Sequence, residues 1–517
     1  MIRMVASLLK IISTGMQDER LQPPKGQPSI DSLLSVLVKA GRYGTNWARI
    51  DFDTKPDFGK IAIARLPVQG ELISRVFLVV QMPDIKTPQA LAQSQPGFVG
   101  PHFGWTNSLG HNLVNQAQLH IGGVLSDTIP GQLMEIMDEF QTPLEKTVEK
   151  SRQLLRKDNG FTDTSFGNSS TSEQVVVNLP FWFSRGDPGC FLPIDALNID
   201  EARITLNFNA INGLYYTQSR AVDSTGNIIQ SNQQGTSLWP MAGSQFYSVD
   251  PSGSVIPGLE PVRAPGKKVK QLPSNISMPT QYSMTDAYLL VEYIYLDKPE
   301  ANRFRIADIQ VPVVQHYIFD PVDTQNNTFA RIPLIVPNPT RDLFFYCQKY
   351  EGPGFNAPFL ATRDLTDSTV QAPWWPDAQG LGERLYTELK PAFSTRNSEP
   401  IRWLALSYSE TLTRYSTENV ALFRSLIPSI EQRKAPWVNR YFYNVPLGLQ
   451  NGYMPFSMPM GEANLDKIQR LNLTMGFHGK TGLITDDLVD RYVVYVYAET
   501  YNILRVYGGR AGMMFAY

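Results

Sequence analysis

The chain has 517 residues, of which 42% are hydrophobic, and a formal net charge of −2 at pH 7. Its length predicts two domains, and its composition excludes a disordered protein and predicts a large core. The near-neutral charge argues against direct nucleic-acid binding, which needs clustered lysine and arginine to displace counterions from phosphates. The two cysteines, Cys190 and Cys347, are too few for a disulfide framework, so we expect folding in a reducing compartment.

Residues 1–24 are expected to form an N-terminal arm. Met4, Leu8, Ile11 and Ile12 lie at helical spacing and form an apolar stripe, and a lysine interrupts the apolar run that a signal peptide would need. No apolar stretch of the sequence approaches the ~20 residues that span a bilayer. We therefore expect a soluble chain whose arm is able to contact a membrane surface or an acidic partner.

Two-residue alternation of apolar and polar side chains predicts strands along most of the chain. In the first half the candidate strands are 46–52, 60–66, 74–82, 116–121, 174–183 and 288–296. In the second half they are 310–319, 330–336, 342–349, 401–408, 470–477 and 492–497. Strands in both halves, without helices between them, predict antiparallel sandwiches of roughly eight strands each.

Helices are expected to be few and local. Segment 131–140 has apolar residues at helical spacing on one face, as expected for a helix that lies on a sheet. A second helix is predicted from Thr142 to about Gly160, because Thr142 begins a capping box and Pro143 follows at the first helical position. A third, at 298–307, is interpreted as the linker between two domains.

Two pairs of segments repeat in the same order along the chain. They are 202–208 with 469–475, and 286–293 with 490–497. This repeat predicts a duplicated β domain. The first copy contains an additional segment, 217–281, that is rich in Ser, Gln, Asn, Gly and Pro, and we expect it to be an exposed insertion.

Several residues at predicted strand ends and turns have a structural reason for their identity. Gly122 and Gly123 permit a tight turn that a Cβ atom would obstruct. Pro180 and Pro193 cannot donate to a strand ladder and mark strand ends, and Trp105 supplies apolar area to a core. The full set of motif positions is Trp105, Gly110, Gly122, Gly123, Pro180, Phe181, Pro188, Gly189, Pro193, Arg203, Asn502, Leu504 and Arg505.

With these motifs the sequence resembles the double jelly-roll major capsid proteins of nucleocytoplasmic large DNA viruses. The resemblance runs through both halves, and its most specific part is the segment Tyr501-Asn502-Ile503-Leu504-Arg505-Val506. Two features depart from the family pattern: segment 457–464 replaces a serine- and glycine-rich motif, and the 217–281 insertion is long. These departures leave the lineage within the family open.

The resemblance implies an all-β fold of two tandem eight-stranded antiparallel jelly rolls with a few short helices in loops. The implied organisation is an arm at 1–24, a first jelly roll at 25–297 with the insertion at about 217–281, a linker helix at 298–307 and a second jelly roll at 308–517. The implied function is structural: a major capsid protein whose homotrimeric, pseudo-hexameric capsomers form the shell of a large icosahedral double-stranded DNA virus.

The resemblance also implies partners and a location. The partners are other copies of the chain in a capsid lattice, minor capsid and penton proteins, and the inner viral membrane through the arm, with no direct nucleic acid. The location is the virion, after assembly in the host cytoplasm. Two alternatives stay open: a double jelly-roll assembly scaffold on a viral membrane, and a carbohydrate-binding or carbohydrate-active β-sandwich protein.

No catalytic, cofactor-binding or metal-binding residues are expected, and we expect no enzyme. The segment Gly476-Phe477-His478-Gly479-Lys480-Thr481 resembles a phosphate-binding loop, but Thr474 stands where that loop needs its first glycine. The five histidines lack the spacing of metal ligands, and no nucleophile motif surrounds either cysteine.

Two kinds of surface motif are weaker candidates. Arg185-Gly186-Asp187 spells a cell-attachment tripeptide and is expected in an exposed turn, where ordinary turn chemistry is the simpler explanation. The glycosylation sequons begin at Asn168, Asn275, Asn326 and Asn472. Glycosylation there would require passage through a secretory pathway, so we expect these sequons to be unused.

Overall fold

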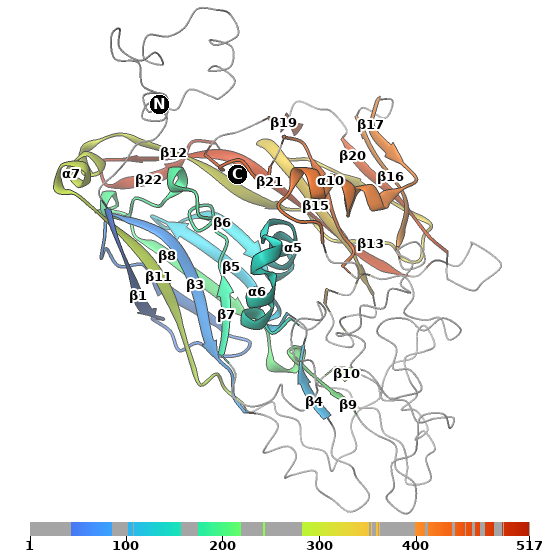
Figure 1. Cartoon of the computed structure of the whole chain (residues 1–517), viewed down its shortest axis with the longest axis horizontal. Coiled ribbons are helices and arrows are strands. Elements are labelled where there is room, and N and C mark those ends of the chain that lie inside the picture. The colour runs from blue at the N-terminus through green and yellow to red at the C-terminus, as the bar shows by residue number, and fades with distance from the viewer. Residues whose placement is uncertain are drawn as a thin grey trace, which may run out of the picture.

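The computed structural model describes residues 43–84, 102–156, 174–218, 282–350, 399–436, 440–479 and 491–515 with short gaps, and a few isolated positions. The predicted N-terminal arm and nearly all of the predicted insertion lie outside the described residues. The described residues form mainly antiparallel sheets with few helices (Figure 1).

The strands that precede helix α7, which we call the first half, form two four-stranded sheets. One sheet has the order β1-β11-β3-β7 and the other has the order β2-β8-β5-β6. The strands are β1 Tyr43–Asp51, β2 Ile61–Arg65, β3 Leu72–Gln81, β5 Val114–Ile121, β6 Val124–Pro130, β7 Gln174–Asn178, β8 Ala202–Phe208 and β11 Asp286–Leu296. Val76, Leu78 and Val80 of β3 are fully buried and alternate with the more exposed Arg75 and Phe77, as expected for a strand with one face in the core.

The strands that follow α7, which we call the second half, form two further sheets. Their orders are β12-β21-β15-β18 and β14-β20-β16-β17. The strands are β12 Ile309–Ile318, β14 Phe329–Pro333, β15 Pro339–Lys349, β16 Ile401–Tyr408, β17 Leu412–Thr417, β18 Phe442–Pro446, β20 Asn472–Phe477 and β21 Tyr492–Tyr507. Three short strands add to the first of these sheets: β13 Val322–Asp323, β19 Ala463–Asn464 and β22 Arg510–Met513.

The remaining elements are short. A small sheet of order β10-β9-β4 contains β4 His102–Trp105, β9 Tyr215–Gln218 and β10 Met241–Ala242. The α-helices are α4 Leu109–Leu113, α5 Gly131–Gln141, α6 Thr147–Leu154, α7 Lys298–Ile306 and α10 Leu426–Glu431. The 3₁₀ turns are η1 Leu144–Lys146, η2 Pro188–Cys190, η3 Ile194–Ala196, η4 Ile211–Gly213 and η6 Val420–Phe423. Within the described part of the chain, no helix is long and apolar enough to cross a membrane.

The sequence predictions of α5 and α7 are confirmed, but the predicted helix from Thr142 is shorter than expected. It begins as a 3₁₀ turn, continues as α6 and ends where Leu155 adopts a left-handed conformation with φ 52°. No side-chain hydrogen bond caps either segment, so the predicted capping box does not form. The candidate strand 174–183 is also shorter than predicted, since β7 ends at Asn178.

The two halves repeat one topology. If the strands of each half are taken in chain order, leaving out the short additional ones, the two sheets join them in the same pattern: first-eighth-third-sixth and second-seventh-fourth-fifth. This is the connectivity of a jelly roll, and the predicted fold of two tandem antiparallel jelly rolls is confirmed. The repeated sequence segments lie on corresponding strands, β8 with β20 and β11 with β21.

A β-bulge at the same place in each half fixes which residues correspond. In the first half the ladder between β11 and β3 skips Ser74 after the pair Glu292–Arg75. In the second half the ladder between β21 and β15 skips Arg341 after the pair Glu499–Asp342. Glu292 therefore corresponds to Glu499, whereas the sequence repeat would have matched Glu292 with Val496. The repeat identified the corresponding strands correctly but aligned their residues wrongly.

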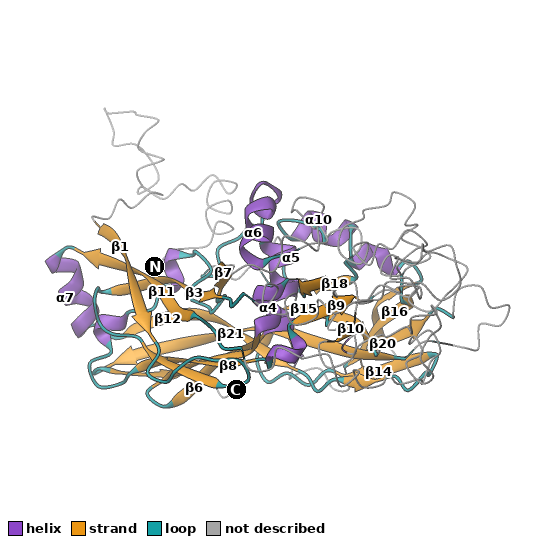
Figure 2. Cartoon of the chain, turned by 90° about the horizontal axis from the view of Figure 1, so that it is seen from below, coloured by secondary structure: helices purple, strands orange, loops and turns teal. Residues whose placement is uncertain are grey.

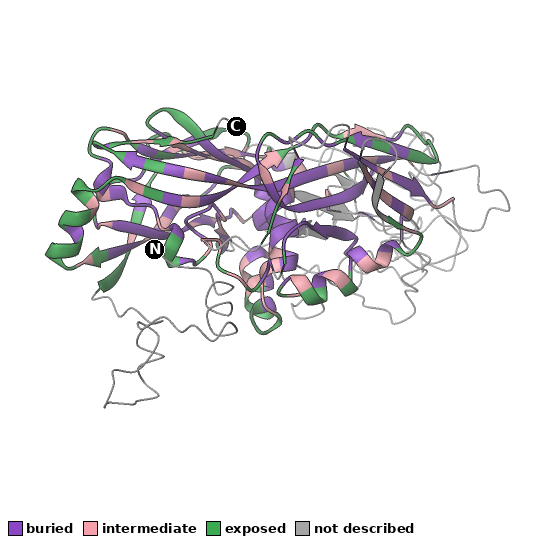
Figure 3. Cartoon of the chain, turned by 90° about the horizontal axis from the view of Figure 1, so that it is seen from above, coloured by how far each residue is buried: buried purple, intermediate pink, exposed green. Residues whose placement is uncertain are grey.

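No strand ladder joins the two halves among the described residues, yet the halves share one buried apolar cluster. Figure 1 shows α5 and α6 between the two sets of sheets, with β12, β21 and β22 extending alongside the first half toward α7. Figure 3 shows that exposed residues gather on α7 and the outer loops, whereas the strands at the centre of the molecule are largely buried. The contact between the halves therefore lies in the middle of the molecule, where Figure 2 shows α4, α5 and α6.

Candidate functional site

The outer face of the sheet β12-β21-β15 is the centre of this contact. Cys347 of β15 points inward, because its Sγ atom lies 3.7 Å from Met475 Sδ of the opposite sheet. Side chains alternate along a strand, so Asp342 and Phe344 point outward. Glu499 of β21 pairs with Asp342, and His316 of β12 pairs with Glu499, so both of these side chains lie on the same outer face. All four outward side chains are buried, and Phe344, Glu499 and His316 contact residues of the first half.

Glu499 is the polar centre of this face. Its Oε1 atom lies 2.6 Å from Arg185 Nη2 of the first half and accepts a 3.4 Å hydrogen bond from Gln141 Nε2 at the end of α5. Burial raises the pKa of Glu499, but Arg185 and His316 outweigh this effect and hold the pKa well below its usual value. Glu499 is therefore an anion that ties its strand to two separate segments of the first half.

His316 adds a second tie. Its backbone N–H donates to Asp127 of β6 at 3.1 Å, and its ring Nδ1 lies 3.1 Å from both carboxylate oxygens of Asp127. Burial lowers the pKa of His316, but Asp127 and Glu499 together raise it to about 9. The imidazole is therefore a cation at neutral pH, held between a carboxylate of each half.

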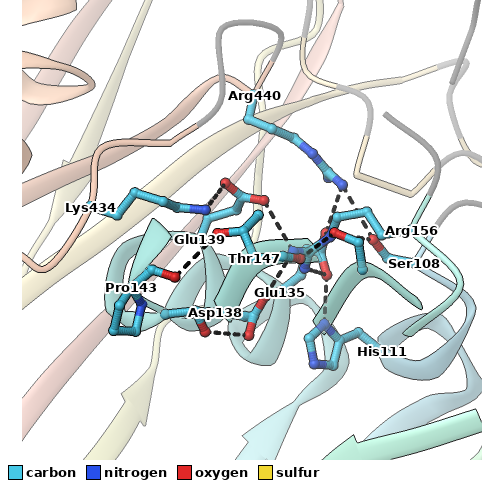
Figure 4. Close-up of polar contacts among 12 residues, drawn as sticks. Ser108, His111, Glu135, Asp138, Glu139, Pro143, Thr147, Arg156, Lys434 and Arg440 are labelled. Atoms are coloured by element: carbon cyan, nitrogen blue, oxygen red, sulfur yellow. Dashed lines mark hydrogen bonds and ion pairs between the residues drawn. The ribbon is translucent and has the colours of Figure 1, made fainter. Parts of the chain in front are cut away.

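Helix α5 carries a second group of buried charges (Figure 4). Glu135 lies 2.7 Å from Arg156 Nη2, 2.8 Å from Arg440 Nη2 and 2.5 Å from His111 Nδ1. Burial raises the pKa of Glu135, but the two arginines and His111 hold it well below its usual value. Arg440 belongs to the second half, so Glu135 connects the halves as well as anchoring α5.

The end of α5 completes the contact. Glu139 lies 3.3 Å from Lys434 Nζ, and the backbone N–H of Lys434 donates to the carbonyl of Phe140 at 3.2 Å. The ring of Phe140 packs against Phe344 with 5.4 Å between centroids. We call this whole set of contacts the junction: α5, Arg185 and Asp127 of the first half against Phe344, Glu499 and His316 and the segment 434–440 of the second half.

The turn between β21 and β22 makes a further contact with the first half. The carbonyl of Gly509 accepts from the backbone N–H groups of Ile199 and Asp200, at 3.1 and 3.2 Å, and Asp200 Oδ2 accepts from Ala511 N at 3.0 Å. Gly122 adopts φ 59°, and a Cβ atom there would lie 2.5 Å from Asp200 Oδ2. The close approach therefore requires glycine at position 122.

The motif positions from the sequence are structural in their surroundings. Trp105, Phe181 and Leu504 are buried, and a Cβ atom at Gly110 would lie 2.7 Å from a Leu154 methyl group. The amide of Asn502 donates to Gln315 Oε1 of β12 at 2.6 Å and to the carbonyl of Phe515 at 3.1 Å, and the second bond holds the last described residues against β21.

The other motif positions lie in turns or on the surface. Pro188 and Gly189 form η2, where Asp187 accepts from Gly189 N at 2.9 Å, and Pro193 directly precedes η3. Gly123 adopts φ 83° beside Gly122, and Pro180 directly follows Leu179 after β7. Arg203 lies on the outer side of β8, and Arg505 pairs with Asp308 at 2.7 Å on the surface.

The expectation of an exposed Arg185-Gly186-Asp187 turn is wrong. The Arg185 side chain is buried, with its guanidinium carbon 3.9 Å from the centroid of Phe456 and its Nη2 atom on Glu499. Among the sequons, Asn472 is buried within β20, where a glycan could not be attached to the folded chain, and Asn326 lies in an exposed turn. Asn168 and Asn275 lie outside the described residues.

The next residues to consider are possible metal ligands, the two cysteines and the phosphate-loop candidate of the described part of the chain. No group of three or more His, Cys, Asp or Glu residues there could hold a metal ion. Burial raises the pKa of the Cys190 and Cys347 thiols, which opposes the thiolate form that a nucleophile needs. Gly476 of the phosphate-loop candidate belongs to β20, and Gly479 pairs with Val489.

Sequence reasoning missed the junction residues. Glu135, Arg156 and Glu499 belong to none of the motifs that the sequence offers. One signal was available for Glu499: it is the single charged residue in the mainly apolar run of β21 from Tyr492 to Leu504. A charge inside such a run predicts a buried partner, although not which one.

Comparison with known proteins follows the same division of the chain. The family described as "Major capsid protein N-terminus" matches residues 37–297, which is just over half of the sequence. The chain belongs to the major capsid protein family. The capsid relatives extend further, since "Probable capsid protein 4" of Acanthamoeba polyphaga mimivirus is 20% identical over 99% of each chain. The "Major capsid protein" of Frog virus 3 is 22% identical over 88% of this chain and 86% of its own length.

Solved structures of capsid proteins share the fold. The Faustovirus major capsid protein aligns with a TM-score of 0.58 at 12% identity, over 97% of each chain. A chain of the PBCV-1 virus capsid aligns with a TM-score of 0.62 at 14% identity, over 93% of this chain and 98% of its own. Both alignments cover nearly all of this chain, so these two solved chains share the fold of both jelly rolls.

Proposed function

We propose that this chain is a major capsid protein that forms the shell of a large icosahedral double-stranded DNA virus. The observation that carries the proposal is the repeated jelly-roll connectivity in a chain that belongs to the major capsid protein family. The role is structural, located in the virion capsid, and involves no catalysis. The buried charges of the junction support it, because they hold the two halves as one rigid building block.

The building block fits a homotrimer. Three chains with two similar halves each would present six similar lobes, and a six-lobed unit tiles a hexagonal lattice. Heterologous contacts of this kind close into a ring when the rotation between copies permits it. The domain boundaries belong to the same proposal: a first jelly roll at 25–297, a linker helix at 298–307 and a second jelly roll at 308–517.

Further partners follow from the same role. The lattice would also contact minor capsid and penton proteins, and the arm at 1–24 would face the inner viral membrane. Assembly would take place in the host cytoplasm. The motif residues would serve this role by shaping turns and strand ends, as the contacts of Gly122 and Asn502 illustrate.

Quantitative mass spectrometry of purified mature particles tests the proposed role. A shell protein should be among the most abundant polypeptides of the particle. Its absence from mature particles, with abundance in assembly intermediates, would contradict the proposal and indicate a scaffold. Light scattering on the recombinant protein tests the trimer separately: we expect three times the 58.1 kDa chain mass, and a stable monomer would contradict the capsomer.

A further inference from the structure

The sheet β14-β20-β16-β17 of the second half has an outer face that takes no part in the junction. Met475 of β20 points into the jelly roll, because its Sδ atom lies 3.7 Å from Cys347 Sγ of the opposite sheet. Side chains alternate along a strand, so Thr474 and Gly476 lie on the outer face. Figure 2 shows β14, β20 and β16 next to one another, at the end of the molecule away from α7.

Two aromatic side chains flank a glycine on this face. In the strand ladders Gly476 pairs with Phe329 of β14 on one side and with Trp403 of β16 on the other. A Cβ atom at Gly476 would overlap the Trp403 indole, 2.6 Å from its Cδ1 atom, so the indole lies over the glycine. Phe329 is 57% exposed, and Trp403 is partly buried. The glycine thus makes room for a flat aromatic surface on the outside of the sheet.

Polar side chains border this aromatic surface. Arg331 pairs with Thr474 one row further along the same face, and Ser407 lies two rows beyond the indole on β16. The residues that line a pocket of about 450 Å³ are Phe329, Arg331, Trp403, Ser407 and Thr474. Pockets that bind small molecules have volumes of roughly 300–1,000 Å³ and combine apolar walls with a few polar groups. This pocket has both properties.

The first half shows that the fold does not require such a surface. The ladder between β5 and β8 skips one residue directly before Gln116, and the ladder between β16 and β20 skips one directly before Trp403. These two residues therefore occupy the same place in the two halves. Asn207 pairs with Gln116, so it stands where the second half has Gly476. An indole over a glycine thus replaces two polar side chains, which is a feature of this sheet and not of the jelly roll.

The lining favours a ligand that has an apolar face and a rim of hydroxyl groups. A purely apolar ligand would cover the rings but would leave the polar groups of the pocket without water or partners, which costs free energy. A pyranose ring can place a flat face of C–H groups on an indole while its hydroxyl groups point outward from its edge. The hydroxyls of Ser407 and Thr474 donate and accept, and the guanidinium of Arg331 donates, so they match both roles of a sugar hydroxyl.

We infer that this pocket is a carbohydrate-binding site, in which one pyranose ring stacks on Trp403 beside Phe329. The polar rim of the pocket binds the hydroxyl groups of the sugar. The lining residues lie on three neighbouring strands, so the site is formed before the ligand arrives and little ordering is needed. The site is contained in one chain, and it adds a ligand to a protein whose proposed role is structural.

Saturation-transfer difference NMR on the full chain tests the inference. The probes are the methyl glycosides of glucose, galactose, mannose and N-acetylglucosamine, with adenosine monophosphate as a probe for base stacking. At least one glycoside should receive saturation from the protein, most strongly on the C–H protons of one ring face. No saturation of any glycoside, or saturation of the nucleotide alone, would overturn the inference.

Substitutions in the pocket locate the bound glycoside. Trp403→Leu keeps an apolar side chain but removes the flat ring, and the dissociation constant should rise about tenfold. Thr474→Val keeps the side-chain shape but removes the hydroxyl, and the rise should be about threefold. The control is Tyr507→Leu, which removes an aromatic side chain that is 65% exposed outside the pocket. Equal weakening by the control, or unchanged binding in both pocket variants, would overturn the inference.

A matched pair of substitutions tests the stacking surface without removing a group that contacts the sugar. Gly476→Ala places a Cβ atom where the indole lies, so the ring must move and binding should be lost. Asn207→Ala makes a substitution at the corresponding position of the first half and should leave binding unchanged. Circular dichroism checks that both variants are folded. If Gly476→Ala does not fold, unchanged binding in Thr474→Val is the result that overturns the inference.

Purified particles distinguish two sources of the sugar, a glycan of the host-cell surface and a glycan carried by another chain of the particle. For the first source, the bound glycoside in excess should block attachment of particles to host cells. For the second source, mass spectrometry of particle peptides should find attached hexoses. Unchanged attachment together with an absence of attached hexoses would overturn the assignment of a carbohydrate ligand.

Discussion

Glu292 and Glu499 occupy the same place in two copies of one fold, yet their surroundings differ. Glu292 accepts from Ser74 Oγ at 2.6 Å, lies 3.5 Å from Arg75 of its own sheet and keeps some exposure to solvent. Glu499 is fully buried and is held by Arg185, Gln141 and His316. The duplicated scaffold thus provides the position. The neighbouring half determines whether the glutamate there is partly exposed and paired within its own sheet, or fully buried and tied to the other half.

The difference also shows what buried charges do in this protein. A buried ion pair adds little net stability compared with apolar packing, but removal of one partner leaves a charge without compensation. Arg185 illustrates the cost, since its Nε and Nη1 atoms have no hydrogen-bond partner among the described residues. The junction therefore serves to fix one orientation of the halves, and its charges should be sensitive to single substitutions.

The substitution Glu499→Gln should have the largest effect. It leaves Arg185 and His316 buried without their shared anion, and we expect a loss of about 3–5 kcal/mol in unfolding free energy. The matched variant Glu292→Gln removes a partly screened charge at the corresponding position and should cost less than about 1 kcal/mol. Thermal and urea unfolding of both variants would measure the two losses. Equal losses would mean that the position, and not the neighbour, sets the role of this glutamate.

The pH dependence of stability should reveal His316. Because its pKa in the fold is raised to about 9, its contribution is complete below the ordinary value of about 6.5 and is lost as pH rises toward about 9. We expect a decrease of about 3 kcal/mol in unfolding free energy across this window. Thermal midpoints measured across it should fall for the wild type. In His316→Gln this component should be absent, and an unchanged slope in that variant would contradict the assignment.

A smaller effect is expected at the turn that meets the β21–β22 hairpin. Gly122→Ala places a methyl group against Asp200 and should cost about 2–3 kcal/mol, from left-handed strain and the steric contact together. Gly123→Ala also has a positive φ, but its Cβ atom meets nothing within 4 Å, so about 1 kcal/mol is expected. Differential scanning fluorimetry would compare the two. An equal shift would show that the contact with Asp200 yields without cost.

Sequence patterns predicted the fold better than they predicted the junction. Strand alternation depends on one residue and its immediate neighbours, so β3, β11 and β12 were located from sequence alone. The register of the repeat was missed because it depends on bulges at Ser74 and Arg341, which only the paired strands define.

The junction was missed for a related reason. Arg185 and Glu499 are separated by 314 residues, and nothing in either local sequence indicates the other. The tripeptide that contains Arg185 even has the composition of an exposed turn. A buried charge is readable from sequence when it interrupts an apolar strand, as Glu499 does, but its partner depends on how the two halves meet.

A cryo-electron microscopy map of purified particles would test the central claim most directly, namely that this chain is a shell protein whose buried charges hold its two halves in one orientation. The account predicts that both jelly rolls of each copy lie in the shell, with Arg185 in contact with Glu499 and Phe140 packed against Phe344 as in the single chain. A map in which the halves adopt another relative orientation, or in which the shell lacks this chain, would contradict it.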